Sequence, residues 1–319
     1  MRLRDKQRGV ALLVAIVMFA IATTVAAAIT YNKAMAARRA AATFTLEQAL
    51  QAGMAAEALA SIALEDDGSN QRTEIHRKWA EAMGPVEIEG TGIWIQGQLE
   101  DLTARFNLNS LVKWVPPPVG QFEEDPRQVQ VFANLLAHHN IDQRFAPLVA
   151  DWLDNNIIPQ ATGGGEDTLY LTQTPPYRPP NTFITHTSEL LALPGFGAEN
   201  YRLIAPYVTA LPNDAQVNPC TASGLVLDMN NNDGQQQWQN APLEINRKKG
   251  CWPTRSDVQA AFVDQSLWAA ADPHYVEKSK WFRLRTNIRI GTAEFVLYSV
   301  LFREDSNRVR VFQRSFGSE

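Results

Sequence analysis

The sequence predicts an α+β fold, in which a long N-terminal helix packs on an antiparallel sheet and a large helical domain is inserted between them. Three observations lead to this prediction. A helical pattern runs from Val10 to about Glu65, a period of two begins at Phe282, and roughly 150 residues between them have mainly helical periodicity. Because a helix cannot bury its apolar stripe alone, we expect the first segment to pack on the last.

The chain begins with a basic leader and an apolar helix. Four cations come first: Arg2, Arg4, Lys6 and Arg8. Val10–Thr30 then contains no charged residue, no Pro and no Gly, and at helical rise it spans about 30 Å, the thickness of a bilayer's hydrocarbon core. The pattern continues as an amphipathic helix interrupted only by Gly53. We therefore predict a leader at residues 1–9 and a transmembrane part at 10–30, with the body outside the cytoplasm by the positive-inside rule.

A secretory signal peptide or an uncleaved signal anchor is the alternative interpretation of the same stretch. Small residues at Val25–Ala28 could suit a signal peptidase. The alternatives differ in where the mature chain begins.

The rest of the chain divides into three parts. A helix outside the membrane and the first strands are expected over residues 31–112, with extended sequence at Val86–Asp101. After the break at Pro116–Pro118, a mainly helical domain is expected over residues 113–278, with a long loop at Asn155–Asn181. Residues 279–319 are expected to form a three-stranded antiparallel meander.

Composition limits the possible functions. The formal net charge is −5, so nothing overall favours nucleic acid as a partner. The chain has two cysteines, Cys220 and Cys251, which would pair in an oxidising compartment; two buried free thiols are the alternative. No Cys or His spacing typical of zinc is present, and no nucleophile or phosphate-loop motif indicates an enzyme.

Short motifs spread over nearly the whole chain carry a family resemblance. They are Arg8-Gly9-Val10-Ala11-Leu12-Leu13, Arg105-Phe106-Asn107-Leu108-Asn109, Asp151-Trp152-Leu153-Asp154, Gly165-Glu166-Asp167 with Tyr170, Pro176-Tyr177-Arg178 with Asn181, Ser188-Glu189-Leu190, and Val217-Asn218 with Thr221-Ala222-Ser223. In these motifs and their order, the chain resembles the K-type minor pseudopilins of bacterial type II secretion, the general secretion pathway protein K family. The resemblance implies a type IV pilin-like fold with a large inserted helical domain.

The resemblance also implies how the protein is processed and where it acts. A prepilin peptidase would cut between Gly9 and Val10, and Val10 would be N-methylated. The subunit would be a single-pass inner-membrane protein that caps the tip of the periplasmic pseudopilus and takes part in export of folded proteins across the outer membrane. Its expected partners are the I- and J-type minor pseudopilins, other pseudopilins, and the secretin or the exported substrate. Most pilin-like subunits have Glu at the fifth mature position, where this chain has Val14, and the K-type subunit is known for lacking it.

Acidic residues indicate a calcium site in the inserted domain. Asp151, Asp154, Glu166 and Asp167 bracket the flexible Gly163–Gly165 turn, and Ca²⁺ prefers such oxygen ligands in irregular geometry. The resemblance implies calcium in this domain as well. The carbonyls of Asn155 and Asn156, beside Asp154, are candidate further donors. The alternative is that Asp154 and Asn155 cap a helix while Glu166 and Asp167 are solvated.

Two other motifs suggest different functions. Asp228–Gly234 resembles the start of an EF-hand loop, but its Gly is one place late and Gln239 stands where Glu is required. Leu193–Gly197, followed by Tyr201, Ile204 and Tyr207, resembles a helix-hairpin-helix. The rival function is therefore a membrane-anchored DNA-binding module of a DNA-uptake system, although the region lacks a Lys/Arg cluster.

Overall fold

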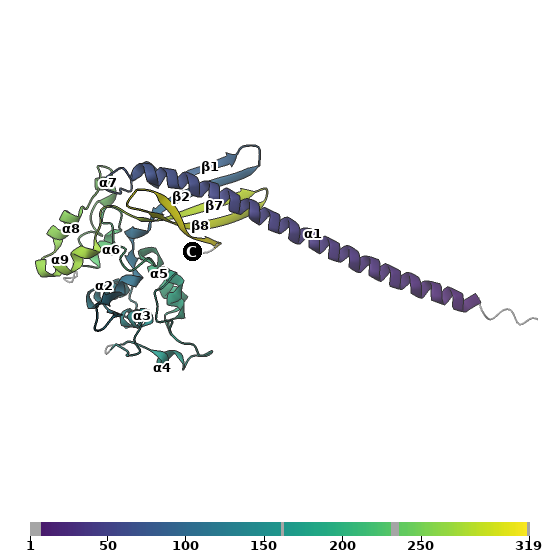
Figure 1. Cartoon of the computed structure of the whole chain (residues 1–319), viewed down its shortest axis with the longest axis horizontal. Helices are drawn as coiled ribbons and strands as arrows, with labels where there is room; N and C mark the ends of the chain where they lie inside the picture. The colour runs from purple at the N-terminus through teal and green to yellow at the C-terminus, as the bar shows by residue number, and fades with distance from the viewer. Residues whose placement is uncertain (1–7, 161–162, 231–235, 318–319) are drawn as a thin grey trace, which may run out of the picture.

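One long helix projects from a body made of a sheet and many short helices (Figure 1). The computed structural model describes residues 8–160, 163–230 and 236–317. Helix α1 (Arg8–Asp67) is continuous through the predicted transmembrane part, and fully buried side chains along it begin at Ala49. Its most apolar 18-residue window has a mean hydropathy of 2.7 and none of it is buried, so by length and composition this helix could cross a membrane.

A five-stranded antiparallel sheet forms from both ends of the chain. In spatial order its strands are β1 (Met83–Ile88), β2 (Ile93–Asp101), β7 (Trp281–Ile290), β8 (Ala293–Arg303) and β9 (Val309–Phe316). The predicted C-terminal meander is confirmed as β7–β9, and the extended stretch after α1 forms β1 and β2. β2 pairs with β7 along its whole length, which sets Asp101 opposite Phe282.

The C-terminal half of α1 covers one face of this sheet through a stripe of small residues, namely Ala49, Ala52, Gly53, Ala56 and Ala60. A Cβ atom on Gly53 would lie 2.4 Å from Cδ2 of Leu297, so the glycine sets how closely the helix approaches β8. Buried Glu57 lies on the same face. It accepts hydrogen bonds from Nε and Nη2 of Arg314, at 2.8 and 2.7 Å, and from the Ser299 hydroxyl at 2.6 Å.

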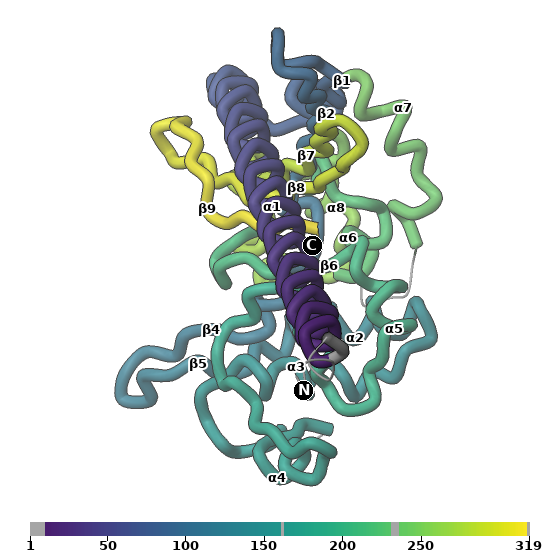
Figure 2. The backbone as a smooth tube through the Cα atoms, turned by 90° about the vertical axis from the view of Figure 1, so that its right-hand side faces the viewer, coloured from purple at the N-terminus to yellow at the C-terminus, as the bar shows by residue number. Residues whose placement is uncertain are grey.

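Everything between β2 and β7 belongs to the inserted block. Its α-helices are α2 (Pro126–His138), α3 (Phe145–Leu153), α4 (Asp167–Tyr170), α5 (Gly197–Ile204), α6 (Gly224–Asp228), α7 (Leu243–Arg247), α8 (Arg255–Ala261) and α9 (Gln265–Ala271). Its short strands pair as β3 (Phe106–Asn107) with β6 (Val208–Thr209) and β4 (Val112–Val115) with β5 (Gln121–Glu124). One 3₁₀ turn, η1 (Lys78–Ala80), precedes β1. The block itself contains the 3₁₀ turns η2 (Leu102–Ala104), η3 (Leu108–Leu111), η4 (Thr187–Ala192), η5 (Ala205–Tyr207) and η6 (Asp272–His274). The block lies beside the sheet and beyond its end, away from the projecting half of α1 (Figures 1 and 2).

The molecule has two main hydrophobic cores, and their composition corrects one predicted domain boundary. One core joins α1 to the sheet, and the other fills the inserted block. Phe106, Leu108 and Leu111 belong to the core of the block, although residues 31–112 were assigned to the pilin-like unit. The boundary predicted at residue 112 is therefore about ten residues late, because the chain leaves the sheet at Asp101 and enters the 3₁₀ turn η2 directly.

The close approach at Gly53 gives a first testable prediction. Gly53→Leu should lower the stability of the folded body by about 1–3 kcal/mol, since the added side chain collides with Leu297 in a packed interface. Ala58→Leu, at an exposed position of the same helix, is the matched control and should change stability little. Thermal unfolding of the two variants measures the difference. An equal effect of both substitutions would show that Gly53 does not set the distance between helix and sheet.

Candidate functional site

A buried carboxylate holds the inserted block to the sheet. Asp101, the last residue of β2, is 3% exposed and accepts hydrogen bonds from the hydroxyls of Ser279 and Thr103, both at 2.5 Å, and of Thr221 at 2.6 Å. Burial raises its pKa, and the hydroxyl donors oppose that rise. Since Thr221 lies deep in the block and Ser279 just before β7, this carboxylate joins the strand that enters the block, the block itself and the strand that leaves it.

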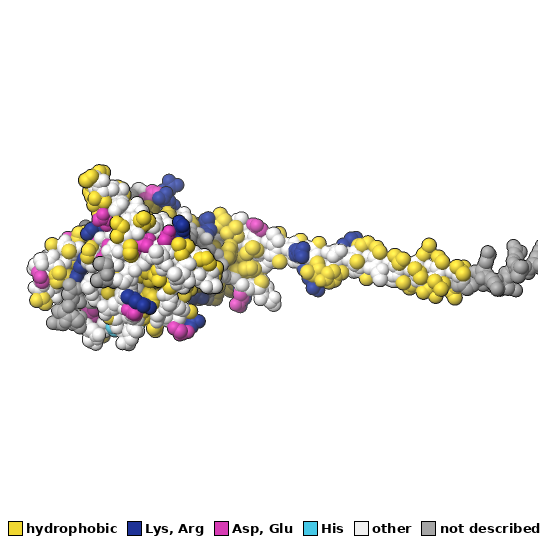
Figure 3. All heavy atoms as spheres, turned by 90° about the horizontal axis from the view of Figure 1, so that it is seen from below, with side chains coloured by type: hydrophobic (Ala, Val, Ile, Leu, Met, Phe, Trp, Pro, Cys, Tyr) yellow, Lys and Arg dark blue, Asp and Glu magenta, His cyan; other side chains and the backbone are white. Residues whose placement is uncertain are grey.

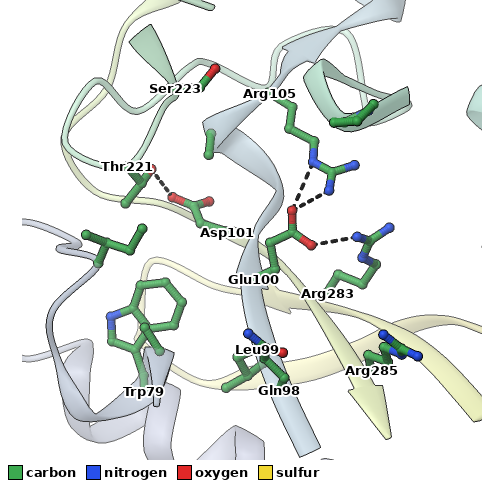
Figure 4. A pocket seen from close by; sticks show the side chains of 14 residues that line it. Trp79, Gln98, Leu99, Glu100, Asp101, Arg105, Thr221, Ser223, Arg283 and Arg285 are labelled. Carbon is green, nitrogen blue, oxygen red and sulfur yellow. Dashed lines mark hydrogen bonds and ion pairs between the residues drawn. The ribbon is translucent and has the colours of Figure 1, made fainter. Parts of the chain in front are cut away.

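A cleft of about 540 Å³ opens beside this junction (Figure 4). Glu100 lies on its wall and forms ion pairs with Arg105 and with Arg283, the latter at 2.6 Å. Burial raises the pKa of Glu100, but the two guanidinium groups outweigh this effect and hold it below its ordinary value. Both carboxylates of the wall are thus already paired, and neither His nor Cys is among the described residues that line it. The arrangement suits a joint between the sheet and the inserted block.

The second candidate is the acidic loop that follows α3. Asp151 on α3, Asp154 at its C-terminal cap and Glu166 on the returning loop are 0%, 0% and 4% exposed. One oxygen of Asp151, Oδ2, accepts hydrogen bonds from the backbone N–H groups of Gly165 at 2.8 Å and of Gln160 at 3.1 Å. These bonds bring the loop back over the end of α3, so three of the four predicted ligands are buried in the same region of the block.

Several oxygens in this place have no hydrogen-bond donor among the described residues. They are Oδ1 of Asp151, Oε1 of Glu166 and Oδ1 of Asn181. A buried acceptor without a donor is costly, and oxygens of this kind are the ligands that a hard cation prefers. Asn181 was not among our predicted ligands; the sequence signal was its place in the Tyr177–Asn181 motif, and its positive φ of 47° holds it in a tight turn.

Electrostatics agree with a missing positive charge. Burial, and after it the charge of Asp151, raise the pKa of Asp154 to about 7. Burial, followed by the charges of Asp151, Asp154 and Asp167, raises the pKa of Glu166 to about 7. Like charges in a buried site cannot all ionise without a compensating cation.

The fourth predicted ligand, Asp167, lies differently. Its side chain is 41% exposed and Oδ2 is 3.4 Å from Nη1 of Arg178, so an ion pair already occupies it. In the part of the chain that the structure describes, no three acidic, His or Cys side chains converge closely enough to hold a metal by themselves. An ion here would therefore need amide or backbone oxygens in addition to the carboxylates.

The remaining predicted sites fall as follows. Cys220 and Cys251 form a disulfide with their Cα atoms 4.6 Å apart. The predicted cleavage site between Gly9 and Val10 lies in the first turn of α1, whereas residues 1–7 of the leader lie outside the described residues. In the EF-hand-like stretch, Asp228 accepts hydrogen bonds from the N–H groups of Trp238 and Gln239, both at 2.9 Å, and residues 231–235 lie outside the described residues.

The helix-hairpin-helix-like motif forms a turn between η4 and α5. Gly195 and Gly197 have positive φ angles of 80° and 75°, and Phe196 is buried between them. On α5 the one cation, Arg202, is 2.5 Å from Glu199 and is paired with it. A hairpin without free cations lacks the main source of affinity for a phosphate backbone.

The long helix, the sheet on its C-terminal half and the insert between β2 and β7 define a pilin-like protein with an inserted helical domain. The chain is 30% identical over 325 residues to the type II secretion system protein K of Pseudomonas aeruginosa, covering 99% of this chain and 94% of that protein. The chain belongs to the type II secretion system protein K family, whose members are structural components of the secretion system. It is thus a minor pseudopilin of type II secretion.

Other comparisons agree. The family model for type II secretion system protein K matches residues 104–213. The protein K of Pectobacterium carotovorum is 28% identical over 337 residues, covering 99% of this chain and 98% of that protein. A chain of the crystal structure of the GspK-GspI-GspJ complex from the type 2 secretion system of enterotoxigenic Escherichia coli superposes with a TM-score of 0.75 at 23% identity, covering 88% of this chain and 100% of that chain. The comparisons do not support a DNA-uptake module.

The raised pKa values in the acidic loop lead to a prediction of how the stability of the folded protein depends on pH when divalent cations are removed. Asp154 and Glu166 have folded-state pKa values raised to about 7, so between about pH 4 and pH 7 the folded protein binds more protons than the unfolded chain. In EDTA the melting temperature should therefore fall as the pH rises through this window. The double variant Asp154→Asn, Glu166→Gln should have a shallower slope. A slope unchanged in that variant would assign the pH dependence to other groups.

Proposed function

We propose that this chain caps the tip of the periplasmic pseudopilus and so takes part in export of folded proteins across the outer membrane. The observation that carries this proposal is the position of the inserted block, beside the sheet and beyond its end, opposite the projecting half of α1 (Figure 1). In a fibre whose subunits stack through their N-terminal helices, the block would fill the space that a further subunit needs. A subunit of this shape therefore ends a fibre and cannot form its shaft.

Val14 supports the same position. Pilin-like subunits use a Glu at this place to neutralise the amino terminus of the subunit ahead, whereas this chain presents an apolar side chain that is 44% exposed. A subunit at the end of the fibre has no subunit ahead of it, so it has no charge to neutralise there.

We also propose that residues 10–30 anchor the subunit in the inner membrane, with one crossing and the body in the periplasm. A prepilin peptidase would remove residues 1–9 and Val10 would become the methylated amino terminus. The absence of charge from Val10 to Thr30 and the full exposure of this segment support the anchor, since an exposed apolar helix needs either lipid or partner helices around it.

The partners are proposed from a relative of this chain. The enterotoxigenic Escherichia coli relative was solved in a complex with GspI and GspJ. We propose the I- and J-type minor pseudopilins as the neighbours of this chain, with other pseudopilins below them. The block at the far end would face the secretin or the exported protein. The proposed role involves no catalysis, since it consists of packing and steric exclusion.

Calcium is the proposed structural cofactor of the acidic loop. Asp151, Asp154 and Glu166 would hold it, with Asn181 as a neutral donor. The partnerless buried oxygens of Asp151, Glu166 and Asn181 support this assignment. Bound Ca²⁺ would supply the positive charge that these carboxylates lack. It would tie the end of α3 to the loop at Gly165–Asp167 and so hold the outer surface of the block in one shape.

Substitutions at this loop test the calcium proposal. Addition of Ca²⁺ to about a hundred times its dissociation constant should raise the stability of the folded chain by about 2.7 kcal/mol. Asp151→Asn and Glu166→Gln should abolish most of this gain, while Asp167→Asn should keep it, because Asp167 is paired with Arg178. Thermal unfolding with calcium and with EDTA measures each difference. If Asp167→Asn is the variant that loses the response, the ligand set proposed here is wrong.

Pseudopili isolated from cells that carry a C-terminally tagged chain test the position in the fibre. Antibody against the tag should label one end of each pseudopilus, because the inserted block prevents further stacking. The intact mass of the chain in the same preparation should match a polypeptide that begins at methylated Val10. Labelling along the shaft would contradict the tip position, and a chain that begins near Ala28 would contradict the proposed processing.

A deletion supplies the matched control. Asp101 and Phe282 are opposite one another, so a short turn can replace residues 102–280 without changing the register of β2 and β7. The shortened subunit should retain the core that joins α1 to the sheet and should be found along the shaft. If it still labels only one end, the block is not what ends the fibre.

A further inference from the structure

The stretch of α1 between the membrane anchor and the body carries an unusual distribution of charge. From Val10 to Leu46 the charged residues are Lys33, Arg38 and Arg39, and the first acidic residue is Glu47. All three cations are exposed on the projecting part of the helix. Dark blue side chains accordingly lie between the yellow apolar end of the helix and the body, on both its upper and lower sides in Figure 3.

The three cations surround the helix. At about 100° per residue, Lys33, Arg38 and Arg39 lie roughly 140°, 100° and 120° apart around the axis. A helix that contacts one protein partner gathers its contact residues on one side, at spacings of three and four. An even distribution instead fits surroundings that are the same on every side, as in a plane of lipid headgroups.

Their height along the helix fits the same surroundings. With a rise of 1.5 Å per residue, Lys33 lies about 4.5 Å beyond Thr30, and Arg38 and Arg39 lie about 12–14 Å beyond it. Side chains on a helix lean toward its N-terminus, so the long arginines extend back toward the bilayer. Tyr31, 66% exposed, stands at the boundary where aromatic residues are typical of membrane interfaces.

We propose that Lys33, Arg38 and Arg39 form a cationic girdle that binds the anionic phospholipid headgroups of the leaflet from which α1 emerges. This inference rests on the proposed membrane anchor and adds a lipid partner to it. The girdle fixes the depth of α1 in the bilayer whatever the rotation of the helix about its axis. The exposed helical residues that follow separate the body from the bilayer surface. Attraction to an anionic surface falls off within a Debye length, about 8–10 Å, which the leaning side chains bridge.

Processing makes this contact more important. The leader contributes Arg2, Arg4, Lys6 and Arg8 to the other side of the membrane, and the proposed cleavage after Gly9 removes all four. The girdle is then the one cluster of charged side chains between the new amino terminus and Glu47. It holds the processed subunit at the membrane surface until partner helices replace the lipid around it.

The test uses the full chain in nanodiscs, with a nitroxide attached at Ala36→Cys. The two native cysteines are paired in a disulfide, so this is the single thiol available for labelling. In discs that contain phosphatidylglycerol the label should be less accessible to a water-soluble nickel relaxer than in discs of phosphatidylcholine alone. About 1 M NaCl should abolish the shift, since it shortens the Debye length to about 3 Å.

Two triple variants make the test specific. Lys33→Gln, Arg38→Gln, Arg39→Gln should lose the lipid-dependent shift. The control variant removes the same charge from exposed positions on the body, through Lys248→Gln, Lys249→Gln and Arg308→Gln. This control should keep the lipid-dependent shift. If both variants behave like the native chain, or if the native chain shows no shift, the girdle does not bind lipid.

Flotation of the same proteins with liposomes separates this inference from the anchor itself. Flotation with both lipid compositions but no shift at residue 36 would overturn the girdle and leave the anchor standing. Failure to float with either composition would overturn both. Loss of binding to the I- and J-type pseudopilins in the girdle variant, without any effect of lipid, would assign the cations to a protein interface and overturn the lipid proposal.

Discussion

The pairing of β2 with β7 is the constraint on which the rest of the structure depends. The two strands are far apart in the sequence, yet Asp101 and Ser279, 178 positions apart, share a hydrogen bond where the strands meet. The inserted block is therefore attached through two adjacent strand ends, and its core can form separately from that of the sheet. Because Asp101 also binds Thr221 from inside the block, the orientation of the block is fixed by buried, directional bonds as well as by packing.

The same sheet divides α1 into a half that is packed against protein and a half that is exposed. From Ala49 on, small residues on α1 allow the backbone to approach β8 closely, and Glu57 is neutralised by Arg314 at the edge of the sheet. Before that point the helix has no tertiary contacts that bury it, so its apolar half is available to lipid or to neighbouring helices. Because α1 is one continuous helix, its exposed half is joined directly to the sheet and, through β2 and β7, to the block.

The acidic loop is a part of the block whose folding carries an electrostatic cost. Its carboxylates are buried near one another, and their raised pKa values reflect first the cost of ionising a buried group and second the repulsion between them. A cation removes this cost, whereas low pH removes it by protonation. The stability of this loop is thus expected to depend on pH.

The sequence by itself determined the class of this protein. The apolar helix, the period-two C-terminal segments and the helical middle follow from local periodicity, and the order of short motifs was enough to identify the family. Only the tertiary structure decided which groups meet. It placed Phe106–Leu111 in the block, brought Asn181 to the acidic loop and turned Asp167 toward Arg178. These contacts join residues distant in the sequence, and no local pattern encodes which distant side chain shares a buried site, because packing and charge compensation act in three dimensions.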